Sequence, residues 1–224
     1  IGESQVEEAA GDEIEALPAL EVGYCARQGE VDVRLIGPPE SVGRAAGMIS
    51  GRLGEFVFST DGASLERVVV GRLREAGATL ATAESCTGGY LAHRVTNVPG
   101  SSAVFRGGAT CYSNQLKSAL AAVDPALIAS HGAVSPQVAA AMADGARRQL
   151  GGDYALSTTG IAGPDGGTAD KPVGTVFIGL ATPDGAASAH HRRFRSDRLS
   201  FKHMASQCAL DLLRRQLAGL RLDW

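Results

Sequence analysis

Between residues 64 and 217 the sequence alternates extended and helical patterns, and this alternation constrains the fold more than any other feature. The β-prone runs are residues 79–83, 103–112, 154–158, 173–181 and 187–194. Helical spacing or capping signals separate the first three of these runs, such as Ser135-Pro136 at the start of a helix predicted over 136–150, and a glycine-rich loop precedes the fourth. Thr182–Gly185 is a turn signal that makes the last two strands a hairpin. The pattern predicts a three-layer α/β/α domain around a mixed sheet.

The first 60 residues differ from the rest in charge. They carry 11 acidic and four basic side chains, whereas residues 61–224 carry 13 acidic and 17 basic ones. Strands at 19–24 and 31–36, a helix capped by Ser41, and a short strand at 55–58 predict a small α+β subdomain. We therefore place one domain over residues 1–62 and a larger one over 63–224. Residues 1–17 are expected to be a frayed end or linker.

Composition excludes several classes of protein. No apolar run approaches the roughly 18 residues of a membrane span, and the acidic start is not a signal segment. The four cysteines are scattered without a C-x-x-C pair, which excludes a zinc ribbon and indicates reduced thiols of a cytoplasmic protein. We expect no bound metal and no cofactor.

A nucleic-acid module is the alternative interpretation of the first part. Gly51-Arg52-Leu53-Gly54 matches the G-x-x-G loop of KH modules, but it also fits the C-terminal cap of a helix. The acidic balance of residues 1–60 favours the cap, because phosphate binding depends on clustered lysine and arginine. Nucleic acid is not an expected partner.

Ala83–Gly89, with the sequence AESCTGG, is the first segment that can carry chemistry. A strand ends, Ser85 and Cys86 follow, and two glycines open a helix. This order can hold a nucleophile at a sheet edge, with helix N–H groups facing an oxyanion or phosphate. The alternative is an ordinary strand-to-helix turn with Thr87 as its cap.

Two further segments could complete a site. In the run 110–117, Tyr112 ends a strand and Lys117 lies one turn into a helix, where burial can make a lysine the base for a serine. The glycine-rich loop 159–167 can aim several N–H groups at a phosphate, although it could also be a flexible hairpin tip. A basic cluster at Arg192, Arg193, Arg195 and Arg198 could hold phosphate too, but we favour a solvated strand end.

Taken together, these blocks resemble the C-terminal domain of the CinA (competence/damage-inducible protein) family. The matching strings are TAESCTGG (82–89), VPGSSAVFRGG (98–108), CYSNQLK (111–117), HGAVS (131–135), GIAGPDGG (160–167) and KPVGTVFIGL (171–180). The resemblance covers about residues 64–218. Residues 19–60 are similar to the small KH-like middle segment of full-length members. A nucleotide-processing domain precedes that segment in the family, and the first residue here is Ile1 rather than methionine, so we expect a longer natural chain.

The resemblance implies a metal-independent nicotinamide-nucleotide amidase, which converts nicotinamide mononucleotide and water into nicotinate mononucleotide and ammonia in NAD recycling. Carried over by motif, Ser85 is the nucleophile and Lys117 the base, with Tyr112 beside it. N–H groups near Thr87 and Gly88 would hold the oxyanion. The substrate-binding residues implied are Glu84, Cys86, Thr87, Gly88, Gly89, Ser101, Ser102, Ser113, Asn114, Gly160, Gly163, Asp165 and Gly166. The phosphate would lie against the loop 160–167 or against Ser101-Ser102.

Some alternatives stay open. Cys86 is a rival nucleophile, and Cys111 stands where the family pattern leads us to expect threonine or valine. A nucleotide-sensing or protein-interaction module linked to competence or DNA damage is the other function. The partners expected are a pyridine nucleotide and a second copy of the chain, since the family habit and the alanine-rich helix 136–150 suggest a dimer.

Overall fold

The computed structural model describes residues 2–222, and Ile1 lies outside the described residues. The chain divides into two compact units, with the division between Ser64 and Leu65. The predicted boundary lies at 62/63. Within residues 2–222, no helix is long and apolar enough to cross a membrane.

The smaller unit packs helices on one two-stranded sheet. Its strands β1 (Glu21–Arg27) and β2 (Glu30–Ile36) pair antiparallel. Its helices are α1 (Glu3–Ala10), α2 (Asp12–Glu15) and α3 (Pro39–Leu53), followed by the 3-10 turn η1 (Gly54–Phe56). The buried apolar side chains of this unit are Val6, Ile14, Leu17, Ala45, Ile49 and Leu53. The unit is therefore of the α+β class.

The structure corrects three expectations in this unit. A frayed end or linker is expected over residues 1–17, but within the described residues 2–17 the chain forms α1 and α2, because Val6 and Ile14 are buried in the core of this unit. Their many acidic neighbours obscure this in the sequence. Ser41 is not a cap, because Pro39 starts the helix two residues earlier. The Ser41 hydroxyl instead donates to the Pro18 carbonyl at 2.9 Å. Residues 55–58 are not a strand, since the Val57 N–H closes a 3-10 turn on the Gly54 carbonyl.

The G-x-x-G segment forms the end of α3 and its cap. Residues 51–53 belong to the helix, and Gly54, at φ +48°, donates its N–H to the Ser50 carbonyl. The helix therefore ends at Gly54 with a positive φ, as the cap interpretation predicts, although ψ of −114° places this glycine outside the left-handed region of the usual caps.

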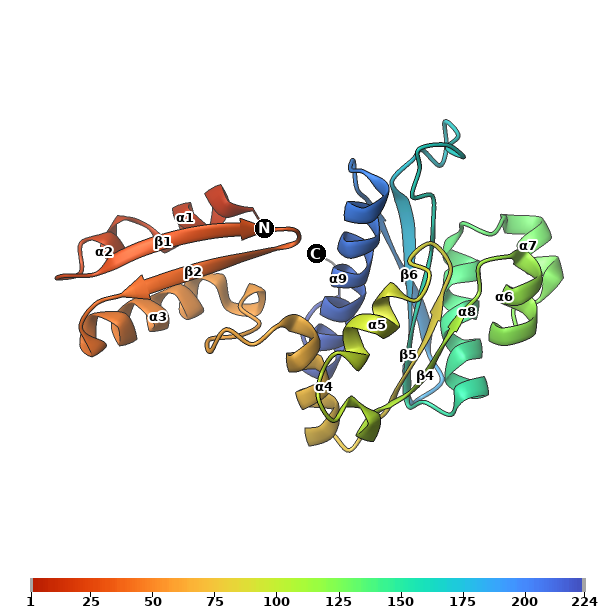
Figure 1. Ribbon diagram of the computed structural model, residues 1–224, viewed down its shortest axis with the longest axis horizontal. Helices are drawn as coiled ribbons and strands as arrows, with labels where there is room; N and C mark the ends of the chain where they lie inside the picture. The colour runs from red at the N-terminus through yellow and green to blue at the C-terminus, as the bar shows by residue number, and fades with distance from the viewer. Residues whose placement is uncertain (1, 223–224) are drawn as a thin grey trace. The chain divides into compact units, whose positions relative to one another are not determined.

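The larger unit is built on one five-stranded mixed sheet of order β4-β3-β5-β6-β7 (Figure 1). Its strands are β3 (Leu80–Glu84), β4 (Phe105–Thr110), β5 (Tyr154–Gly160), β6 (Thr175–Ala181) and β7 (Ala187–Arg193). The first three of these run parallel to one another, whereas β6 and β7 are antiparallel to their neighbours. The three-layer mixed-sheet prediction is confirmed, including the closing hairpin.

Helices cover both faces of this sheet (Figure 1). One face carries α8 (Pro136–Leu150), with α6 (Asn114–Ala121) and α7 (Pro125–His131) against it. The other carries α9 (Arg198–Leu217), α5 (Tyr90–Thr96) and α4 (Leu65–Glu75), with the 3-10 turn η2 (Ser101–Ala103) near β4. Because β3 and β5 end at the same edge, the segments that follow them come together there.

Helix α8 uses its small residues inside the unit. Ala139, Ala143 and Ala146 are fully buried. A Cβ on Gly145 would lie 1.7 Å from the Ala121 carbonyl oxygen of α6. The alanine-rich face that suggested a dimer is thus covered by the sheet and by α6, and the dimer stays a prediction that rests on the family habit.

Candidate active site

Ser85 stands at the first position after β3, in a sharp turn into α5. Its N–H donates to the Thr158 carbonyl of β5 at 2.8 Å, which continues the sheet pairing by one residue. Gly88 and Gly89 then adopt φ of +61° and +92°, a region that disfavours side chains. The Gly88 N–H, to which an oxyanion role is assigned above, donates to the Ser85 carbonyl at 3.2 Å. The turn thus holds Ser85 at the sheet edge.

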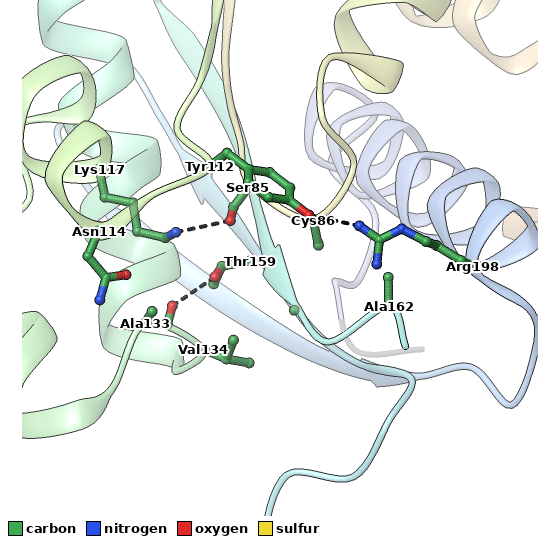
Figure 2. Close-up of a pocket in the computed structure, with 11 residues that line it drawn as sticks. Ser85, Cys86, Tyr112, Asn114, Lys117, Ala133, Val134, Thr159, Ala162 and Arg198 are labelled. Carbon is green, nitrogen blue, oxygen red and sulfur yellow. Dashed lines mark hydrogen bonds between the residues drawn. The ribbon is translucent and has the colours of Figure 1, made fainter. Parts of the chain in front are cut away.

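Lys117 reaches this serine from α6 on the neighbouring segment. The Ser113 hydroxyl caps that helix by accepting from the Leu116 N–H at 3.1 Å. The buried Lys117 Nζ lies 3.0 Å from Ser85 Oγ (Figure 2). It also donates to the Cys111 carbonyl at 3.2 Å. Burial lowers the pKa of Lys117 below its ordinary value of 10.5. A neutral amine beside a hydroxyl can accept its proton.

Cys86 is next to Ser85, but its burial disfavours the reactive, charged form of its thiol. Burial raises the pKa of its thiol to about 12, with a smaller contribution from the Glu84 carboxylate. The Thr158 side chain acts in the other direction but does not offset this. The thiol therefore stays protonated at neutral pH, whereas the thiolate is the reactive form.

A cavity of about 230 Å³ opens at this edge of the sheet. It is lined by Ser85, Cys86, Tyr112, Asn114, Lys117, Ala133, Val134, Thr159, Gly160, Ala162 and Arg198 (Figure 2). The guanidinium of Arg198, the first residue of α9, donates to the Tyr112 hydroxyl at 2.8 Å and to the Gly163 carbonyl at 2.9 Å. The cavity thus has the serine and lysine on one side and a fixed cation on the other.

The structure brings together part of the predicted site. Six predicted residues line the cavity, namely Ser85, Cys86, Tyr112, Asn114, Lys117 and Gly160. Gly163 contacts Arg198 through its carbonyl, and Ser113 is the cap of α6. Glu84, the last residue of β3, and Thr87, Gly88 and Gly89 of the turn that follows Ser85 do not line the cavity.

The remaining predicted residues lie outside the lining. Ser101 is buried in η2, whereas Ser102, Asp165 and Gly166 are exposed. Of the two segments considered for the phosphate, the glycine-rich loop adjoins the cavity, through Gly160 and Ala162, and Ser101-Ser102 does not line it. The roles assigned to all these residues stay predictions.

Sequence reasoning missed several lining residues. Arg198 is named in the sequence as a possible phosphate ligand but is assigned there to a solvated strand end, and this assignment is wrong: it lies in the first turn of α9, lines the cavity and contacts Tyr112, from which it is 86 positions away. The cap signal at Asp197, which accepts from the N–H groups of Leu199 and Ser200, marks that turn. Ala133 and Val134 also line the cavity; they lie in the HGAVS string (131–135), for which the sequence predicts no role. Among residues 2–222, no group of three or more His, Cys, Asp or Glu side chains could hold a metal ion.

Comparison with known proteins gives the same family over most of the chain. The family model described as the CinA C-terminal domain matches residues 62–217. A CinA-like protein of Acidobacterium capsulatum is 42% identical over 97% of this chain and 54% of its own length. Another from Akkermansia muciniphila is 43% identical over 94% of this chain and 51% of its own. The chain thus spans about half the length of these curated relatives.

Solved structures agree with the sequence relatives. A competence/damage-inducible protein of Agrobacterium tumefaciens is 36% identical, with a TM-score of 0.67 over 72% of this chain and 98% of that one. A CinA superfamily protein of Klebsiella pneumoniae is 32% identical, with a TM-score of 0.67 over 69% of this chain and 96% of that one. The family match, the relatives and the mixed sheet agree, and the chain belongs to the CinA family.

Proposed function

We propose that the larger unit hydrolyses the carboxamide of a nicotinamide nucleotide, releasing ammonia and leaving a nicotinate nucleotide. The observation that carries this proposal is the 3.0 Å approach of a buried lysine amine to the Ser85 hydroxyl. Serine hydrolysis needs a base within hydrogen-bond reach of the nucleophile, and Lys117 has both the position and a lowered pKa. Family membership directs the choice of substrate, as the motif resemblance implies.

In the proposed reaction, neutral Lys117 takes the proton of Ser85 as its oxygen attacks the carboxamide carbon. The resulting ammonium of Lys117 then gives this proton to the departing nitrogen, so that the C–N bond breaks and ammonia leaves. A water molecule, deprotonated by the same amine, attacks the ester on Ser85 and releases the carboxylic acid, which then ionises by giving its proton to the released ammonia or to water. Ser85 recovers its proton, and the sequence consumes one water for each ammonia.

Tyr112 and Arg198 form the opposite, polar side of the cavity. Because the Tyr112 oxygen accepts from Arg198, its own hydrogen is available as a donor towards a ligand. The Arg198 guanidinium suits a phosphate or another anion of the nucleotide. The cavity, about 230 Å³, is below the roughly 300–1,000 Å³ of typical ligand pockets, so part of a nucleotide would extend beyond its mouth.

The substrate is tested by product analysis with EDTA present. Nicotinamide mononucleotide and free nicotinamide are incubated separately with the protein, and chromatography follows the conversion to the corresponding acid. We expect nicotinate mononucleotide and an equal amount of ammonia from the nucleotide, and far less acid from nicotinamide. Saturable binding of the nucleotide without either product would contradict the proposal and favour the sensing module.

A further inference from the structure

The buried carboxylate of Glu84 is fully engaged inside the protein. Its Oε2 accepts from the Thr87 hydroxyl at 2.6 Å and from the N–H groups of Gly89 and Leu91 at 3.0 Å each. Its Oε1 accepts from the Ala92 N–H at 2.8 Å. With 1% of its surface exposed, Glu84 has no access to the cavity. Its negative charge lies where the first N–H groups of α5 converge.

These contacts also connect the turn that carries Ser85 to the neighbouring strand β5. Since Thr87 gives its hydrogen to Glu84, the hydroxyl of Thr158, 2.7 Å away, must donate to the Thr87 oxygen. Thr158 belongs to β5, and its carbonyl also accepts from the Ser85 N–H. The side chain of Glu84 is thus linked through Thr87 to Thr158 of β5, and its main chain is bonded directly to Ser85.

The main chain of Glu84 leads to the base as well. Its carbonyl accepts from the Cys111 N–H at 2.7 Å, and the Cys111 carbonyl accepts from Lys117 Nζ at 3.2 Å. Lys117 then meets Ser85 at 3.0 Å. The contacts close a ring through Glu84, Cys111, Lys117 and Ser85. A displacement of Glu84 therefore changes the position of the nucleophile and of the base together.

We infer that Glu84 is a positioning residue: its carboxylate occupies the N-terminal end of α5 from inside the protein and so fixes Ser85 at hydrogen-bond distance from Lys117. This replaces the substrate-binding role predicted for Glu84 from the sequence. It also means that a substrate anion does not compete for these N–H groups and has to bind elsewhere in the cavity. The inference rests on the proposed function only in taking Ser85 as the nucleophile.

The test separates positioning from substrate binding. We would measure kcat and KM for nicotinamide mononucleotide, melting temperature, and the rate at which a fluorophosphonate labels Ser85, in the wild type, Glu84→Gln and Thr87→Val. The glutamine places an amide hydrogen against N–H donors, and the valine removes the hydroxyl without changing the volume. We expect kcat and the labelling rate to fall together by about 10- to 100-fold, because small displacements of reacting groups have effects of this size. KM should stay within about threefold.

Two variants serve as controls. Thr87→Ser keeps the hydroxyl and should restore both rates. Asp153→Asn alters a carboxylate at the opposite ends of the same strands, where it accepts from the Thr79 N–H at 2.9 Å and hydroxyl at 2.7 Å. It should lower the melting temperature without lowering the labelling rate. If Glu84→Gln does not fold, Thr87→Val and Thr87→Ser still decide the question.

Each outcome has a distinct meaning. A raised KM with unchanged kcat in Glu84→Gln would make Glu84 a substrate ligand and overturn the inference. Wild-type kcat and labelling in both variants would overturn it too. If the wild type releases no ammonia but labels at Ser85, and the variants label more slowly, the proposed function fails while the positioning role stands. If the wild type does not label, no activated serine exists, and the inference falls.

Discussion

Lys117 is a buried amine whose neighbours offer it oxygen acceptors, and among residues 2–222 no carboxylate forms an ion pair with it. Its described hydrogen bonds go to the Ser85 hydroxyl and the Cys111 carbonyl. Because the charged form loses hydration without gaining an ion pair, burial lowers the pKa of the amine. A lysine placed in this way favours catalysis at the expense of stability, and both effects depend on pH.

The first prediction concerns the pH dependence of activity. Since the reaction needs neutral Lys117, kcat/KM should rise with pH through one ionisation below 10.5 and then become constant. Lys117→Arg should reduce kcat by about 10²- to 10⁴-fold across that range, because a guanidinium stays protonated. Steady-state rates between pH 6 and pH 10 provide the check. A rate independent of pH in the wild type would contradict a lysine base.

The second prediction concerns the pH dependence of stability. Between the lowered pKa of folded Lys117 and 10.5, the unfolded chain binds more protons than the folded one, so rising pH stabilises the fold. Relative to Lys117→Met, the wild-type free energy of unfolding should increase with pH in this window, by at most about 1.4 kcal/mol per pH unit. Urea denaturation of both proteins at several pH values measures it. A constant difference would show that the pKa is not lowered.

At the level of single residues, the sequence and its motif resemblance could pair Ser85 with Lys117, but they could not give the partners of other site residues. The strings around Ser85 and Lys117 carry strong local signals, and both side chains do meet in the structure. Arg198 and Glu84 show the limit. Arg198 reaches the cavity because α9 starts beside it, and Glu84 is withdrawn because α5 supplies donors within the next eight residues. Both facts depend on backbone paths that residue spacing does not specify.

Among the elements, α8 packs between the sheet and α6. It lies on the sheet and against α6, and the approach is close enough to require glycine at 145. Gly179 of β6 makes a similar approach, since a Cβ there would lie 2.3 Å from the Ala139 carbonyl of α8. Because α6 carries Lys117, this packing also fixes the base.

The third prediction tests this contact. Gly145→Ala should lower the free energy of unfolding by about 1–3 kcal/mol, because the added methyl meets backbone that cannot move freely. The matched control is Gly71→Ala in α4, where no heavy atom lies within 4 Å of the new Cβ. That change should stabilise by about 0.5–1 kcal/mol through helix propensity. Chemical denaturation measures both, and equal effects of the two variants would contradict the packing account.

Elements with strong boundary signals were predicted well. Ser135-Pro136 and Gly151 mark α8 at both ends, and the hairpin of β6 and β7 follows its turn residues. The elements predicted wrongly lack such signals or depend on tertiary contacts. Helices α1 and α2 have few apolar residues, and the run at 55–58, which predicts a short strand, instead begins in a 3-10 turn closed by the Val57 N–H. Tertiary burial decided these cases.

At the scale of the whole molecule, the excess of acidic side chains lies in the first unit and the candidate catalytic residues lie in the second. Every cavity-lining residue belongs to the unit that begins at Leu65. About 70% of this chain covers the two solved relatives almost completely.

The fourth prediction follows from this division. Residues 65–224 alone should unfold cooperatively and keep kcat and KM for nicotinamide mononucleotide within about twofold of the full chain. Calorimetry and ammonia release test it on the same preparation. Loss of activity in a truncated protein that still unfolds cooperatively would show that the first unit takes part in the site. Light scattering on both proteins would test the predicted dimer in parallel.

The most direct test of the central claim is ammonia release from nicotinamide mononucleotide, with EDTA present, by the wild type, Ser85→Ala and Cys86→Ala. The account predicts release by the wild type, a loss of at least about 10³-fold in Ser85→Ala, and retention of most activity in Cys86→Ala. Full activity in Ser85→Ala together with loss in Cys86→Ala would contradict it, because the thiol would then be the nucleophile.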